Sequence, residues 1–414
     1  GAVAIAMMVS LVIILQRYQF KCLINSTSLS IFAAMTVHFH KTQQDLILQA
    51  FKAGRNSHAQ LFMGPAGNGK LELALWYAAL MLCQQPTDHG PCGVCSSCLQ
   101  NKAFTHPDLQ FIFPTPSAAA EKLKALSIEF MPQWRDLLQQ NAFFSFDDWK
   151  RATGNYEKSF EIRVAEADQI SKNLSYKSYA GGYKVVLVWL AEWMNVATAN
   201  KILKNIEEPE DRTLILLVCE QADRLLPTIR SRVQSVFFPP LQVSECANYL
   251  TSIGVKEANE IARIADGNLH QALSFLESNE GVREMGVLFA RWMRVCYTVN
   301  MKEILSISDL LSKKSRSYTE NFLRFSLQII REALLLDKSS AIHGDNPVFS
   351  GSDFKIANFS KLIHEENTHG ILQEIDQAVY EISRSVNIKI VMTDLSIRLH
   401  YLMKRGVLPE ALQN

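Results

Sequence analysis

One glycine-rich segment, residues 64–70 (Gly-Pro-Ala-Gly-Asn-Gly-Lys), constrains the fold of this chain more than any other feature. It fits the pattern G-x-x-x-x-G-K, in which backbone N–H groups and a lysine cradle phosphate between a strand and a helix. An apolar run at 60–63 precedes the segment, and residues of helical character follow at 71–78. We therefore expect a phosphate loop in an α/β domain. The alternative is a glycine-rich turn that matches the pattern by chance.

Two metal-holding elements of a working nucleotide site are replaced in this sequence. The position after Lys70, where a hydroxyl normally binds Mg²⁺, carries Leu71, which cannot ligate a metal. The apolar segment 184–190 is expected to form a strand that is buried on both faces. An acidic pair would end that strand in a nucleotidase, and here the positions are Trp189 and Leu190. Glu192 comes two residues late and would substitute only if the strand ended later.

Gly64, Gly67, Gly69 and Lys70 thus form a degenerate phosphate loop. The ammonium and the backbone N–H groups attract phosphate without a metal, so ATP binding stays open as a possibility. We expect no Mg²⁺ site and no hydrolysis by the chain itself. The rival hypothesis is an active nucleotidase with atypical ligands.

Four of the eight cysteines fall within sixteen residues of each other. They are spaced C-x8-C-x2-C-x2-C and are Cys83, Cys92, Cys95 and Cys98. Four thiolates complete the tetrahedral shell of structural Zn²⁺, so we predict a closed zinc site that supports folding rather than catalysis. A redox pair and unrelated buried thiols are the alternatives. His89 and His106 flank the cluster, and we expect both on the surface rather than as ligands.

The composition is that of an ordinary globular protein. The chain has 414 residues, 48% of them hydrophobic and 20% charged, and a net charge of +1. Such a chain is long enough for two or three domains. Its charge argues against a zinc-containing module that binds DNA by itself, because sequence-independent DNA binding requires a concentrated basic surface.

Residues 2–15 form an uncharged apolar run that is shorter than the roughly 20 residues needed to span a bilayer. We interpret residues 1–34 as a non-native or leader extension, with Met35 as the initiator. A signal anchor is the alternative, although it would expose a thiolate zinc site to oxidation. We therefore expect a cytoplasmic chain without membrane association.

Residues 114–160 are interpreted as an insertion. A strand is expected at 109–113, because this apolar segment is short and bounded by prolines. Residues 114–125 are predicted to form a mobile loop. Aromatic residues are scattered through 126–160 without one clean period, so we expect this part to pack on the domain surface. These aromatic residues include Trp134, Phe143, Phe144, Phe146 and Trp149.

The order of motifs resembles the clamp-loader branch of the AAA+ ATPases. Zinc cysteines follow a phosphate loop, and then come "ANKILKNIEEPE" at 199–210 and "LLPTIRSR" at 225–232. Within that branch, the sequence resembles the delta-prime subunits of bacterial DNA polymerase III, of the Bacteroidetes type. Motifs support the resemblance over about residues 40–280 and helical character alone supports it further on.

The resemblance implies roles for individual residues. In this family a Ser-Arg pair sits at a subunit interface, and its arginine reaches the ATP of the neighbouring subunit. That role falls on Ser231 and Arg232, with Val233 in place of the usual cysteine. A permanently charged, planar guanidinium suits such a role, and the alternative is a surface arginine in a salt bridge. His270 stands where a phosphate-sensing arginine is usual, and our default for it is a structural histidine.

The resemblance also implies the organisation and the partners. We expect an AAA+ domain with a parallel sheet over 35–240, a helical lid over 241–283 and an all-α collar over 284–414. Apolar residues recur every three or four positions in the last region, as in packed helices. The expected function is that of a clamp-loader subunit in a pentameric ring, within the DNA polymerase III holoenzyme. Its implied partners are the ATPase subunits and the delta subunit, with the sliding clamp and primer-template DNA contacted through the complex.

Overall fold

The computed structural model describes residues 37–117, 126–155, 158–255, 257–277, 282–314, 316–338, 349, 354–384, 386–409 and 412. The predicted extension 1–34, Met35 and most of the predicted loop 114–125 lie outside these residues. The chain divides into two compact units, 1–241 and 242–414. No helix within the described ranges has both the length and the apolar character needed to cross a membrane.

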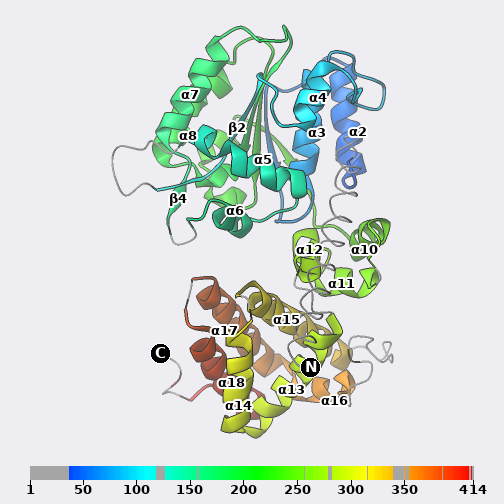
Figure 1. Ribbon diagram of the computed structural model, residues 1–414, viewed down its shortest axis with the longest axis vertical. Helices are drawn as coiled ribbons and strands as arrows, with labels where there is room; N and C mark the ends of the chain where they lie inside the picture. Colours follow the sequence, from blue (N-terminus) through cyan, green and yellow to red (C-terminus); the bar gives the residue numbers. More distant parts are fainter. Residues whose placement is uncertain are drawn as a thin grey trace, which may run out of the picture. The chain divides into compact units, whose positions relative to one another are not determined.

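Unit 1 is built on a five-stranded parallel sheet in the order β2-β5-β6-β1-β7 (Figure 1). The strands are β1 (Ala59–Met63), β2 (Leu109–Ile112), β5 (Lys184–Trp189), β6 (Thr213–Cys219) and β7 (Gln234–Phe237). The strand that enters the phosphate loop, β1, lies between β6 and β7, with Phe62 in register with Val218 and Val236. The loop is thus flanked by the carboxyl ends of both neighbouring strands, where ligands of α/β folds bind.

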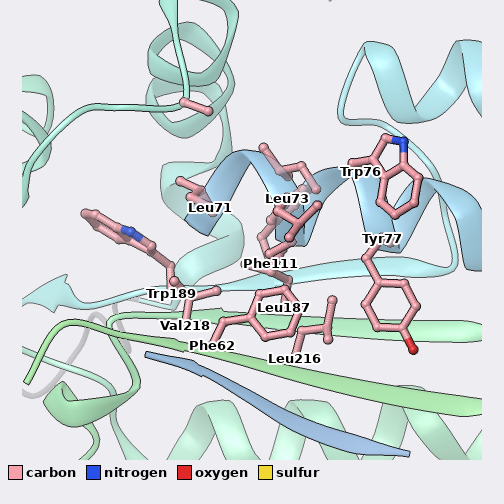
Figure 2. Packing of buried hydrophobic residues seen from close by; sticks show 14 of the residues in the cluster. Phe62, Leu71, Leu73, Trp76, Tyr77, Phe111, Leu187, Trp189, Leu216 and Val218 are labelled. Carbon is pink, nitrogen blue, oxygen red and sulfur yellow. The ribbon is translucent and has the colours of Figure 1, made fainter. Parts of the chain in front are cut away.

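Helices cover both faces of this sheet, because its strands alternate side chains between two apolar cores. The helices of unit 1 are α2 (Lys41–Lys52), α3 (Lys70–Leu82), α4 (Ser96–Lys102), α5 (Met131–Gln140), α6 (Phe146–Ala152), α7 (Val164–Ser175), α8 (Val196–Glu207) and α9 (Pro227–Arg230). Phe62, Leu187 and Leu216 face α3, as Figure 2 shows, whereas Leu61 and Leu217 face α7 and α8. The predicted strands at 109–113 and 184–190 are confirmed.

The aromatic segment after residue 126 does not pack on the domain surface, contrary to the sequence-based expectation. Trp134 of α5 and Trp149 of α6 are both 0% exposed. Trp134 stacks on Phe113 with 4.5 Å between ring centroids, and its ring lies 5.1 Å from that of Trp189. Two short helices carry these indoles, and each helix contributes its aromatic residues to the core over less than three turns. Helices this short do not show a clear periodicity in the sequence, so the burial of these residues could not be predicted from it.

Unit 2 is all-helical among its described residues. Three short helices come first: α10 (Val243–Ser252), α11 (Ala258–Ile264) and α12 (Leu269–Glu277). Six more follow: α13 (Val282–Thr298), α14 (Met301–Ser312), α15 (Arg316–Lys338), α16 (Ile356–Phe359), α17 (Glu365–Ser383) and α18 (Ile388–Arg405). α18 packs against α13, α14 and α17, and α17 packs against α15. Trp292 of α13 is buried and donates from Nε1 to Ser396 Oγ of α18 at 2.8 Å. The α/β fold followed by an all-helical region confirms the predicted fold class.

Candidate functional site

The phosphate loop joins β1 to α3 through two glycines in the left-handed region. Gly67 has φ +69° and Gly69, at the N-cap of α3, has φ +88°. A Cβ on Gly64 would lie 2.2 Å from the carbonyl oxygen of Phe238, so only glycine fits there. Lys70 begins α3, and its ammonium points back into the loop and donates to the carbonyl of Pro65 at 2.9 Å. The strand, loop and helix predicted from the sequence are therefore present.

The two replaced metal-binding positions are both built into the apolar core. Leu71 is 4% exposed in the first turn of α3 and Trp189 is 2% exposed at the end of β5. Figure 2 shows both side chains in the packed cluster beside Val218. Leu190, also buried, adopts φ +54° after the strand. These positions offer hydrocarbon where Mg²⁺ would need oxygen, so they do not fit a bound Mg·nucleotide.

Two acidic residues, Glu192 and Glu220, approach the loop from elsewhere, and the sequence alone indicated only Glu192. Glu192 is 7% exposed, and its Oε1 accepts the backbone N–H groups of Glu220 and Gln221 at 2.8 and 3.1 Å. Glu220 follows β6 and places Oε1 3.8 Å from Lys70 Nζ. Burial raises the pKa of Glu220, and the Lys70 ammonium opposes that rise. Burial lowers the pKa of Lys70, because it disfavours the charged ammonium. A polar residue directly after a buried strand beside β1 was the signal that could have revealed Glu220.

The four cysteines converge on one point beside the phosphate-loop domain. Cys83 is the C-cap of α3, and Cys95 is the N-cap of α4. Their ligand atoms all lie within 4.8 Å of one another. The Sγ atoms of Cys83 and Cys95 are 4.0 Å apart, those of Cys92 and Cys98 3.9 Å, and those of Cys83 and Cys98 3.6 Å. A tetrahedral ion with Zn–S bonds near 2.3 Å requires sulfur separations of about 3.8 Å. The residues present fit zinc.

The backbone around the cysteines stabilises thiolates. The N–H groups of residues 92, 95 and 98 donate to the sulfurs of Cys83, Cys92 and Cys95 at 3.3 to 3.4 Å. Hydrogen bonds from the backbone of Val94 and Cys95 lower the pKa of Cys92 to about 6, whereas burial raises the pKa of Cys83. Gly90 turns the chain at φ +138° against the ring of Trp76, where a Cβ would meet the indole at 2.9 Å. A bound zinc ion would tie the end of α3 to the start of α4.

The two flanking histidines differ in burial. His89 is exposed, as expected. His106 is 3% exposed, which corrects the expectation of a surface residue. Its Nδ1 accepts the backbone N–H of Asp108 at 3.1 Å, in the turn that leads into β2. Burial lowers its pKa, so the ring is held neutral. Neither histidine belongs to the cysteine cluster among the described residues.

Ser231 and Arg232 lie at the exposed end of α9. The Arg232 side chain is 42% exposed, and its Nε donates to Glu207 Oε1 at the last residue of α8. Its Nη1 donates to the carbonyl of Thr228 at 3.2 Å. Val233, in contrast, is buried in the core beneath α8. The buried Val233 thereby anchors the segment that carries Arg232. His270 lies in the first turn of α12 and is half-buried.

This combination defines a class of protein: a parallel α/β domain with a phosphate loop, apolar residues at the positions that would bind a metal, and a helical region after it. The model of the family described as DNA polymerase III, delta subunit, matches residues 39–242. Over residues 39–242 the chain is therefore related to the delta-prime subunits of DNA polymerase III.

Two named relatives share this similarity. The DNA polymerase III subunit delta' of Pseudomonas aeruginosa is 37% identical over 190 residues, which cover 46% of this chain and 45% of that protein. The match therefore spans about half of that relative's length. The subunit delta' of Escherichia coli is 24% identical over 371 residues, 88% of this chain and 95% of that protein. A solved structure of a gamma subunit-related protein from Thermotoga maritima is similar at 14% identity and a TM-score of 0.40, covering 88% of this chain and 99% of that one.

Proposed function

We propose that the chain is a subunit of the clamp loader of a bacterial replicative DNA polymerase and does not hydrolyse ATP itself. The burial of Leu71 and Trp189 is the observation that supports the absence of ATP hydrolysis. Both positions that would hold Mg²⁺ contribute side chains to one hydrophobic core. Hydrolysis of ATP relies on metal-assisted stabilisation of phosphoryl-transfer charge, and the proposed role therefore leaves this chain as a structural member of the ring.

We further propose that Arg232 acts on ATP held by a neighbouring subunit. Support comes from its exposure at the end of α9 and from the anchoring of the adjacent Val233 in the core. Its carboxylate partner Glu207 is 47% exposed, so the pair is solvated and weak. A solvated pair can exchange at little cost for a phosphate, with which guanidinium forms stronger, bidentate hydrogen bonds. Ser231 lies beside it and donates its hydroxyl to Thr228.

The proposed organisation assigns residues 35–240 to the AAA+ domain, 241–283 to a lid and 284–414 to a collar that joins the subunits. The proposed partners are the ATPase subunits, the delta subunit and, through the complex, the sliding clamp and primer-template DNA. The cysteine cluster holds structural zinc in this proposal, and the compartment is the cytoplasm.

Reconstitution tests the proposal directly. The purified chain is mixed with the ATPase and delta subunits of the same organism, and assembly is followed by size-exclusion chromatography with light scattering. We expect one copy of this chain in a pentameric complex that loads clamps, and ATP turnover by the chain alone at background level. Two results contradict the proposal: failure to enter the complex, or Mg²⁺-dependent ATP hydrolysis by the isolated chain that Lys70→Ala abolishes.

A further inference from the structure

The Lys70 ammonium is already surrounded by acceptors from its own chain. The residue is 5% exposed. Its Nζ donates to the carbonyl of Pro65 at 2.9 Å and lies 3.8 Å from Glu220 Oε1. In a working loop the lysine reaches the β- and γ-phosphates of the nucleotide. Here a carboxylate from the end of β6 provides the negative charge beside it.

A second carboxylate, that of Glu192, holds the backbone of Glu220 in place. Glu192 Oε1 accepts the N–H groups of Glu220 and Gln221, which holds the chain directly after β6. Its other oxygen, Oε2, is buried and has no hydrogen-bond partner within the described part of the chain. Glu220 lies 3.8 Å from the Lys70 ammonium, and the charge of Glu192 also acts on it; the three groups together carry a net charge of −1 when all are ionised. A polyphosphate that approached Lys70 would meet this negative charge in a poorly solvated place, where repulsion is strong.

The loop backbone is also held from within. Asn68 donates from Nδ2 to the carbonyls of Phe238 and Pro239 at 3.0 and 3.3 Å. Its Oδ1 accepts the backbone N–H of Lys70 at 3.3 Å, and its carbonyl accepts from His40 Nε2. The N–H at the start of α3 is one of the groups that would otherwise point at a phosphate. One asparagine thus ties the loop to the segment after β7 and uses an amide that a nucleotide would need.

We infer that the phosphate loop is closed by its own chain: Glu220 takes the place of a phosphate beside Lys70, and this carboxylate is what excludes nucleoside polyphosphates. Replacing Glu220 by a neutral residue opens the loop to a nucleoside triphosphate. Binding to the opened loop does not require Mg²⁺, because Leu71 and Trp189 stay in place. Exclusion by an unfavourable charge is a common way to achieve specificity. The loop keeps its folding role, since it still joins β1 to α3.

The test is a titration of the full-length chain with a fluorescent ATP analogue carrying a methylanthraniloyl group, with and without Mg²⁺. The unmodified chain should show no saturable binding up to millimolar analogue. Glu220→Gln should tighten binding at least tenfold, which corresponds to about 1.4 kcal/mol, equally in both buffers. Asp168→Asn is the matched control: it removes the same charge from an exposed carboxylate on α7 that pairs with Lys201, and it should change nothing.

A double variant and a fold check complete the test. Glu220→Gln with Lys70→Ala should lose the gained binding, because the analogue then has no cation to contact. Circular dichroism and the zinc content per chain show which variants are folded, and Glu220→Ala replaces Glu220→Gln if the latter is not. The inference is overturned if the unmodified chain binds the analogue at micromolar concentration. It is also overturned if the folded Glu220 variants gain no affinity, or if Asp168→Asn gains as much. None of these results depends on assembly of the loader.

Discussion

Two buried tryptophans in the core that contains Trp189 offer a matched test of the hydrogen bonds in that core. Trp134 and Trp149 are both 0% exposed, and their rings pack edge to face with 5.5 Å between centroids. Only one of them uses its polar atom. Trp149 Nε1 donates to the carbonyl of Pro114 at 2.7 Å, whereas Trp134 Nε1 has no partner among the residues that the structure describes.

Replacing each tryptophan by phenylalanine removes the same atoms from the same cluster. The loss of packing is therefore similar in the two variants and largely cancels in their difference. Trp149→Phe in addition leaves the buried carbonyl of Pro114 without its donor, which costs about 1–3 kcal/mol. Trp134→Phe removes a buried N–H that had no acceptor and carries no such cost. We predict that Trp149→Phe is less stable than Trp134→Phe by about 1–3 kcal/mol.

The assay is urea unfolding of the zinc-saturated chain under reducing conditions, followed by far-ultraviolet circular dichroism. With a slope of about 3 kcal/mol per M of urea, the predicted difference separates the two midpoints by about 0.3–1 M. Equal midpoints would refute the reasoning from hydrogen bonding. A lower midpoint for Trp134→Phe would show that packing around that ring, and not the Trp149 hydrogen bond, sets the stability of this cluster.

Three further predictions follow from the site. Metal analysis of protein purified under reducing conditions should find one zinc ion per chain, and Cys98→Ser should lower both the zinc content and the midpoint of thermal unfolding; an unchanged zinc content contradicts the assignment. Leu71→Thr should leave ATP turnover by the isolated chain at background, since Trp189 still occupies the second metal-binding position; hydrolysis by this single variant would show that the site needs only one metal ligand. In the reconstituted loader, Arg232→Lys should slow ATP hydrolysis nearly as much as Arg232→Ala, because a point charge lacks the planar fork; full activity of the lysine variant would show that charge alone suffices.

The sequence was sufficient for the parts of the molecule that depend on local pattern. The glycines around Lys70 specified the turn between β1 and α3, because left-handed backbone and close approach to Phe238 leave few alternatives. The spacing of the cysteines specified their convergence, since C-x-x-C turns direct two sulfurs to one point. The continuous apolar run at 184–190 specified a buried parallel strand for the same local reason.

The remainder depends on contacts between distant segments, which no local pattern encodes. The approach of Glu220 to Lys70 follows from the neighbouring positions of β6 and β1 in the sheet, and strand order is not visible in either segment alone. The burial of His106 follows in the same way from the turn that packs before β2. Trp134 and Trp149 are brought together by two helices too short to display a period.

The most direct test of the proposed function compares two arginines at the same helix end. Arg230 is 45% exposed and pairs with Asp223, and Arg232 is 42% exposed and pairs with Glu207. Each is replaced by alanine, and ATP hydrolysis by the reconstituted loader is measured with clamp and primer-template DNA. Arginine fingers contribute about 10³–10⁵ in rate at a single site, so a ring with several sites should lose the share of one interface. We predict a partial loss for Arg232→Ala, normal assembly, and no loss for Arg230→Ala. Equal rates for both variants and the unmodified loader would contradict the proposed role of Arg232.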